Sequence, residues 1–203
     1  MKTLTTLLLS LLILTVACSQ QVQLDIQPEG VLFSENSDTI LFYQTAEKSQ
    51  NGAYPRANYI HPLHTLDGAI LTEDFPKDHP HHRGIFWAWH QLYVGDQRIG
   101  DGWEIKDFQW EVQTVKELSR KDCAKSIQAT VVWKSSLWID NAGNNNPLVL
   151  EKTTITAHPL EDHYRRVDVT ISILALEPDM RIGGSEDAKG YGGFSPRILK
   201  TYL

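Results

Sequence analysis

The chain has 203 residues, of which 41% are hydrophobic and 22% are charged, a composition typical of globular proteins and not of disordered or fibrous ones. This length allows one domain or two small ones. Nineteen Lys and Arg stand against 25 Asp and Glu, a net charge of −6, and there is no basic run to neutralise phosphates, so we expect no nucleic-acid partner.

The N-terminus predicts export and a lipid anchor. An apolar run at residues 7–16 is too short to span a bilayer, and the small residue Ala17 precedes Cys18. Residues 14–18 resemble a bacterial lipobox, in which the cysteine is lipidated. We therefore predict a lipoprotein signal peptide over residues 1–17 and a lipid-anchored protein of the cell envelope or periplasm. A plain cleaved signal is the alternative.

Alternation of apolar and polar residues predicts β-strands along most of the remaining chain. It is clear at residues 22–26, 127–133 and 167–173. Residues 103–112 also alternate, but the phase changes at residues 106–107, which predicts a strand with a β-bulge.

Two polar segments, residues 46–57 and 140–147, are expected to be loops. No segment keeps a helical period for long, so we predict an all-β fold, an antiparallel β-sandwich of two packed sheets. A tether at residues 18–24 would lead into this single domain at residues 25–203.

Histidine and tryptophan are concentrated in one part of the chain. Six of the eight histidines lie within residues 61–90, and four of the six tryptophans lie within residues 87–110. Imidazoles titrate near neutrality and ligate metals, and indole faces suit the C–H face of a sugar ring. This density predicts an active or binding site.

The centre of this region is residues 78–84, Asp-His-Pro-His-His-Arg-Gly. Pro80 disfavours a regular strand, so His79 is expected at the end of a loop and His82 at the start of a strand. In an extended segment, His79 and His81 would share one face and His82 would lie on the other. Acid–base catalysis, a transition metal held by His79 and His81, and binding of an anion with the help of Arg83 all remain open, beside a purely structural role.

A second notable run, residues 187–194, has three glycines in four positions. It predicts a tight turn into a strand or, alternatively, a ligand-binding loop. Arg197 follows on the expected strand, where its guanidinium could point toward an anion.

Three motifs, at residues 59–63, 78–87 and 190–194, resemble a bacterial family labelled "methane oxygenase PmoA", and the resemblance covers residues 25–203. It implies distant similarity to the aldose-epimerase type of β-supersandwich, with His81 or His82 as acid. It also implies a chain that is shortened at its C-terminus and leaves an exposed sheet edge. The label implies a metal-dependent oxidoreductase, although the spanning helices of a true methane monooxygenase subunit are not predicted here.

We therefore expect an exported lipoprotein that binds or acts on a carbohydrate or sugar derivative. The alternatives are a metal-dependent oxidoreductase with a transition metal as cofactor, and a non-catalytic lipoprotein that binds glycans or a partner. A dimer or partner would cover the open edge. The candidate catalytic residues are Asp78, His79, His81 and His82. The candidate substrate-binding residues are His61, Arg83, Trp87, Trp89, Tyr191 and Arg197.

Overall fold

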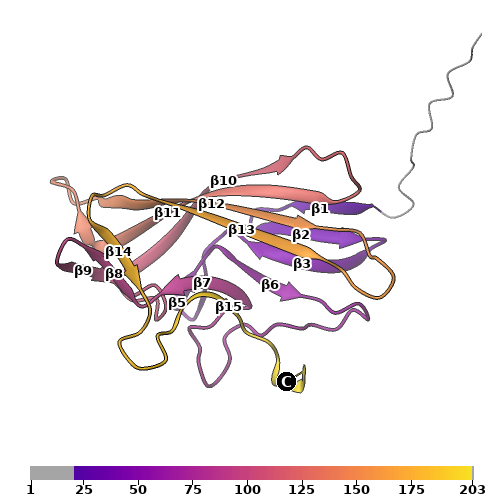
Figure 1. Ribbon diagram of the computed structural model, residues 1–203, viewed down its shortest axis with the longest axis horizontal. Helices are drawn as coiled ribbons and strands as arrows, with labels where there is room; N and C mark the ends of the chain where they lie inside the picture. Colours follow the sequence, from indigo (N-terminus) through magenta and orange to yellow (C-terminus); the bar gives the residue numbers. More distant parts are fainter. Residues whose placement is uncertain (1–20, 203) are drawn as a thin grey trace, which may run out of the picture.

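The computed structural model describes residues 21–202, and almost all regular structure in this part of the chain is β (Figure 1). The strands are β1 (Val22–Ile26), β2 (Gly30–Glu35), β3 (Asp38–Gln44), β4 (Lys48–Gln50), β5 (Ala53–Arg56), β6 (Tyr59–Leu63), β7 (Ile85–Trp89), β8 (Gln91–Val94), β9 (Gln97–Gly100), β10 (Phe108–Leu118), β11 (Lys125–Ile139), β12 (Asn145–Ala157), β13 (Val167–Ala175), β14 (Met180–Gly183) and β15 (Gly192–Pro196), and a 3₁₀ turn, η1 (Lys200–Tyr202), follows. No helix among these residues is long and apolar enough to cross a membrane. The predicted signal peptide and Cys18 lie outside the described residues.

Two antiparallel sheets form a sandwich. One has the strand order β1-β2-β3-β6-β7-β15 and the other the order β10-β11-β12-β13, and β14-β8-β9 and the β4-β5 hairpin are smaller additions. In Figure 1, β10 to β13 cross the upper part of the view, and β6, β7 and β15 lie below them. The predicted all-β antiparallel sandwich is confirmed.

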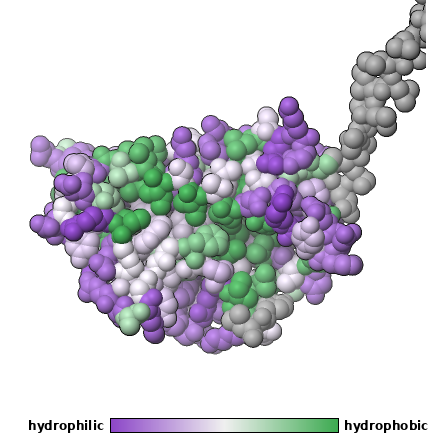
Figure 2. Space-filling model, in the orientation of Figure 1, coloured by the Kyte–Doolittle hydropathy of each residue, from purple (hydrophilic) through white to green (hydrophobic). Residues whose placement is uncertain are grey.

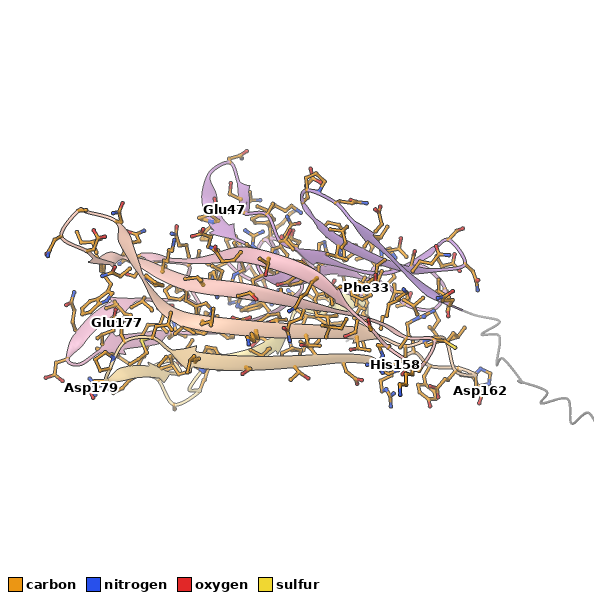
Figure 3. The ribbon with its side chains drawn as sticks, turned by 90° about the horizontal axis from the view of Figure 1, so that it is seen from above. Phe33, Glu47, His158, Asp162, Glu177 and Asp179 are labelled. Atoms are coloured by element: carbon orange, nitrogen blue, oxygen red, sulfur yellow. The ribbon has the colours of Figure 1, made fainter. Side chains whose placement is uncertain are left out.

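The core lies between the two sheets, where the alternation of each strand places its apolar side chains. Ile127, Ala129 and Val131 of β11 and Phe33 and Leu41 of the facing sheet are fully buried in one cluster. Burial of a Val, Leu, Ile or Phe side chain stabilises the fold by roughly 1.5–3 kcal/mol. Figure 3 shows Phe33 among these side chains, with the turns of Asp162 and of Asp179 at opposite ends of the molecule.

A buried carboxylate on β12 joins the sheets within this core. Glu151 Oε1 accepts hydrogen bonds from Trp87 Nε1 and Asn58 Nδ2, both at 2.9 Å, and Oε2 accepts one from Trp133 Nε1 at 2.6 Å. Thr153 Oγ1 also donates to Oε1. Trp87 is thus a core residue whose indole N–H is bonded to Glu151. The prediction that Trp87 packs against a substrate was wrong, because its ring is 1% exposed.

Two predicted boundaries change at the N-terminal side. The tether expected over residues 18–24 is shorter, because Val22–Ile26 pair with β2 over their whole length. Residues 46–57 were expected to be a loop, but they contain the β4-β5 hairpin. Its turn is Asn51-Gly52, with φ of 53° and 85°, the dipeptide that most favours a two-residue hairpin turn.

The expected bulged strand over residues 103–112 is a turn followed by β10. Ile105 and Asp107 have φ of 59° and 53°, which ends any strand there. Asp101 and Lys106 close the turn with two backbone hydrogen bonds of 2.9 Å. The alternation suggested a strand because Trp103, Ile105 and Phe108 all pack toward the interior. Trp103 and Ile105 do so from the turn, and Phe108 does so from the first position of β10.

Candidate functional site

Consecutive turns over residues 76–84 bring three histidines together. The His79 N–H donates to the Pro76 carbonyl at 3.1 Å, and the His82 N–H donates to the His79 carbonyl at 2.9 Å. The ring centroids of His79 and His82 lie 4.9 Å apart and stacked, and those of His81 and His82 lie 4.5 Å apart, edge to face. The prediction that His82 starts a strand was wrong, because β7 begins at Ile85 and His82 lies in the turns that bring all three rings into contact.

Arg83 and Gly84 hold this loop against the sandwich. The Arg83 guanidinium is fully buried, pairs with Asp74 at 3.1 Å, and lies 3.3 Å from the centre of the Phe75 ring. It also donates to the carbonyl oxygens of Lys48 and Tyr54. The prediction that Arg83 binds substrate is corrected, because its guanidinium is enclosed and committed to these partners.

The histidines continue into an aromatic group from three other segments. The His82 ring lies 5.5 Å from the Trp103 ring, edge to face, and Trp103 stacks with His90 at 5.5 Å and with Tyr191 at 5.8 Å. We call this set the histidine–tryptophan cluster, and its members are His79, His81, His82, His90, Trp103 and Tyr191.

Strand pairing places Tyr191 in the cluster. Gly192 of β15 pairs with Trp89 of β7, so the residue before β15 reaches the start of β8. Tyr191 is 47% exposed while Trp103 beneath it is nearly buried. The tyrosine therefore presents an accessible aromatic face at the surface. The glycine-rich run serves as a turn into a strand, as predicted, and it carries a cluster residue as well.

Two carboxylates border the cluster. Asp101 accepts from the backbone N–H groups of Trp103 and Glu104 at 3.0 and 2.9 Å, and its other oxygen lies 3.0 Å from His90 Nδ1. Glu104 is exposed, and its Oε2 lies 3.4 Å from His81 Nδ1. Asp101 thus fixes the loop that aims Glu104 at His81.

The surroundings keep two of the imidazoles neutral. Burial, and then the neighbouring imidazole of His79, lowers the pKa of His81 to about 4. Burial and the imidazole of His81 lower the pKa of His82 to about 3. The His81 imidazole is therefore predominantly neutral at pH 7. Neutral histidines act as bases and hydrogen-bonding groups, so the acid role implied by the family resemblance is not favoured in this environment.

Asp78 and Arg197 are committed to each other. Arg197 Nη2 donates to Asp78 at 2.5 Å, and its Nε donates to Glu73 at 3.4 Å. The hydrogen bond from Arg197 holds the pKa of Asp78 well below its usual value. Asp78 also lies 3.4 Å from His79 Nδ1. The ion pair therefore connects the histidine loop to the segment after β15. Because the Arg197 guanidinium is paired with Asp78 and Glu73, it is not free to bind an anionic substrate, as had been predicted.

The remaining predicted residues lie outside the cluster. His61 Nδ1 is 3.0 Å from Thr72 Oγ1, and burial lowers the pKa of its imidazole. The Trp89 ring is half-buried, 5.7 Å from the Trp133 ring, and its carbonyl accepts from the N–H groups of Gly102 and Trp103. Trp89 therefore supports the cluster through its backbone.

A transition metal held by His79 and His81 was one of the alternatives that the sequence left open. Within residues 21–202, no group of three or more His, Cys, Asp or Glu side chains has an arrangement that could hold a metal ion. The His79 and His81 rings lie 5.8 Å apart, edge to face.

Sequence reasoning missed His90, Asp101, Trp103 and Glu104 as site residues. A signal was present, because Asp-Gly directly after a short strand favours a turn in which the carboxylate accepts backbone N–H groups. What the sequence does not contain is the contact of this turn with β7, where the Trp89 carbonyl accepts from the N–H groups of Gly102 and Trp103.

Comparison with known proteins gives one match. The model of a family described as a family of unknown function (DUF6807) matches residues 31–202, a span that includes the whole histidine–tryptophan cluster. No curated protein and no solved structure matches the chain.

Proposed function

Because the chain belongs to the DUF6807 family, whose function is unknown, we propose a function from the site itself: the histidine–tryptophan cluster binds a carbohydrate or sugar derivative and acts on it by histidine-based acid–base chemistry. The observation that carries the proposal is the stack of Tyr191 on Trp103 next to the His81–Glu104 pair. The stack offers a flat apolar face, and the pair offers a proton acceptor.

A neighbouring cavity has room for a sugar. It measures about 430 Å³, and its lining includes Asp101 and Glu104, the two carboxylates that border the cluster. This volume falls within the range of about 300–1,000 Å³ that is usual for small-molecule sites. Its lining also includes Arg98 and Lys106, so charged groups that can hydrogen-bond hydroxyl groups stand beside apolar surface.

The geometry supports His81 as the base. Glu104 faces Nδ1 of the imidazole, which favours the tautomer with its proton on Nδ1 and leaves Nε2 free to accept a proton. A proton taken from the substrate at Nε2 would create an imidazolium that the Glu104 carboxylate stabilises. The separation of 3.4 Å is loose, as is common before a substrate is bound.

The test compares turnover and binding of glycans by the wild-type protein and two variants, His81→Gln and Glu104→Gln. We expect turnover to fall by about 100-fold or more while binding changes by less than about threefold. His64→Gln is the matched control, because His64 bonds the Gly68 carbonyl on another loop and should keep full activity. Full activity of both cluster variants would refute the acid–base role, and binding without any turnover would favour a non-catalytic glycan-binding protein.

We further propose that the protein is an exported lipoprotein, an inference from residues 1–18 of the sequence alone. Intact mass of the native protein from the membrane fraction tests it. A mass that fits lipid on Cys18 is expected, together with release of a Cys18→Ser variant from the membrane. A mass without lipid would overturn the anchor.

A further inference from the structure

A buried arginine without an acidic partner lies beneath the cluster. Arg56 on β5 is 1% exposed, and its guanidinium is 3.9 Å from the Trp110 ring centre and 4.9 Å from the Phe86 ring centre. Nη2 donates to the Gly102 carbonyl at 2.6 Å, and Nε has no hydrogen-bond partner. Among residues 21–202, no carboxylate forms an ion pair with Arg56.

Arg56 touches the elements that form the cluster. The Phe86 ring below it lies 5.5 Å from the His82 ring and 5.2 Å from the Trp103 ring. Gly102, which accepts its hydrogen bond, is the residue before Trp103. The positive charge of Arg56 therefore acts on the cluster from the interior of the protein, where water does not screen it.

The charges around the cluster are unevenly distributed. Asp101 is engaged with His90 and Arg98, and Asp78 and Glu73 are engaged with Arg197. Glu104 is the remaining carboxylate, and it faces His81. His82 has the imidazoles of His79 and His81 beside it, and Arg56, beneath the neighbouring Phe86 ring, has no ion-pair partner among residues 21–202. The His82 side of the cluster therefore lies over a cation without an ion pair, whereas the His81 side faces the Glu104 carboxylate.

We propose that the ligand of the cluster is an acidic sugar, a uronic acid or a glycan containing one, whose carboxylate lies against His82 above Arg56 while its hydroxyl groups lie toward His81 and Glu104. This inference rests on the proposed function and names its substrate class.

The physical reason combines the buried charge of Arg56 with the unpartnered imidazole of His82. Arg56 has no ion-pair partner, and its charge attracts an anion at His82 through the poorly screening interior without contacting it. Neither His82 ring nitrogen has a hydrogen-bond partner among the described residues, so an N–H is free to donate to a carboxylate. Such charge-assisted hydrogen bonds are short and about twice as strong as neutral ones.

The experiment is calorimetric titration of the wild-type protein with a panel of oligosaccharides that contain glucuronate or galacturonate, and with the same oligosaccharides after chemical reduction of the carboxyl groups. We expect the acidic forms to bind at least about tenfold more tightly, with affinity falling as salt is raised. Equal binding of the reduced forms would overturn the inference and leave the proposed function intact. Binding of neither panel would overturn the proposed function and this inference with it.

Two substitutions test the position of the carboxylate. His82→Gln should weaken binding of the acidic glycan by about tenfold. Glu104→Gln should change binding by less than about threefold, because Glu104 faces His81 and the hydroxyl groups of the ligand and not its carboxylate. The opposite pattern would place the carboxylate elsewhere. Arg56→Met removes the buried cation and Arg56→Lys keeps it, so only Arg56→Met should weaken binding of the acidic glycan. If the Arg56 variants do not fold, the His82→Gln and Glu104→Gln measurements decide the question.

Discussion

At the residue scale, the central property of the site is that His81 and His82 are uncharged at neutral pH. Each ring is partly buried and lies against other imidazoles, and these surroundings disfavour a positive charge. The same surroundings that prepare His81 to accept a proton also tie the stability of the protein to pH. The first prediction follows from this link.

We expect the protein to lose stability as the pH falls from 7 toward 4. The pKa of His81 is about 4 and that of His82 about 3 in the folded protein, below the value of about 6.5 in an unfolded chain. The unfolded state therefore binds more protons in this window, and its population rises on acidification. The loss between pH 7 and pH 5 should be about 1 kcal/mol per histidine, allowing for solvent access. Urea unfolding at both pH values measures it, and an unchanged pH dependence in His82→Gln would contradict the assignment.

Tyr191 should contribute to glycan affinity without supporting the fold. Its ring is 47% exposed and stacks on Trp103, so Tyr191→Ala removes the accessible face of the cluster and leaves the core intact. We expect affinity to fall by about three- to tenfold. Tyr164→Ala is the matched control, because Tyr164 is at least as exposed as Tyr191 but donates a hydrogen bond to Glu161, away from the cluster. Equal losses in both variants would refute a specific role for Tyr191.

At the element scale, the histidine loop is held by groups that are themselves buried. Arg83 connects it to the β4-β5 hairpin, and Gly84, with φ of 37°, lies so near β6 that an added Cβ would come within 2.0 Å of the Ile60 carbonyl. The loop that carries the site is thus part of the packed structure, which preorganises the three imidazoles.

Arg83→Met should destabilise the protein by about 3–5 kcal/mol, because it leaves the Asp74 carboxylate without its buried partner. Lys48→Met removes the exposed partner of the same carboxylate and should cost less than about 1 kcal/mol. Chemical denaturation of both variants measures the difference. Similar small losses would mean that Arg83 does not anchor the loop.

Strands were predictable where one face of the strand is buried, because burial imposes alternation on the sequence. The strands around residues 22–26, 127–133 and 167–173 were found in this way. Residue type alone does not reveal burial of polar groups. Trp87 was misassigned because Glu151, which accepts its indole N–H, lies on a distant strand. Arg83 was misassigned because the β4-β5 hairpin, whose Lys48 and Tyr54 carbonyls accept from it, encloses its guanidinium. The contact of His79, His81 and His82 was not predicted, because it depends on the turns at residues 76–84, and Tyr191 joins them only through the pairing of β15 with β7.

At the scale of the whole molecule, the sandwich is open along one side. Within the described residues, β13 pairs only with β12, and β15 pairs only with β7. Between them lies a largely apolar cavity of about 480 Å³, whose lining includes Ile60, Val169 and Phe194. Figure 2 shows hydrophobic residues gathered across the face where β13 lies.

We expect this edge to promote self-association at high concentration. The β12–β13 register is regular over all nine residues of β13, and the strand has no Lys, Pro or bulge that would block a further strand. Leu174 is 58% exposed on it. Leu174→Lys should therefore reduce the concentration dependence seen in sedimentation velocity, since a charged edge residue opposes pairing. Ile70→Lys, which changes an exposed residue outside the named strands, is the control and should leave association unchanged. If the wild-type protein sediments as a monomer at every concentration tested, the edge is protected in a way that its sequence and pairing do not reveal.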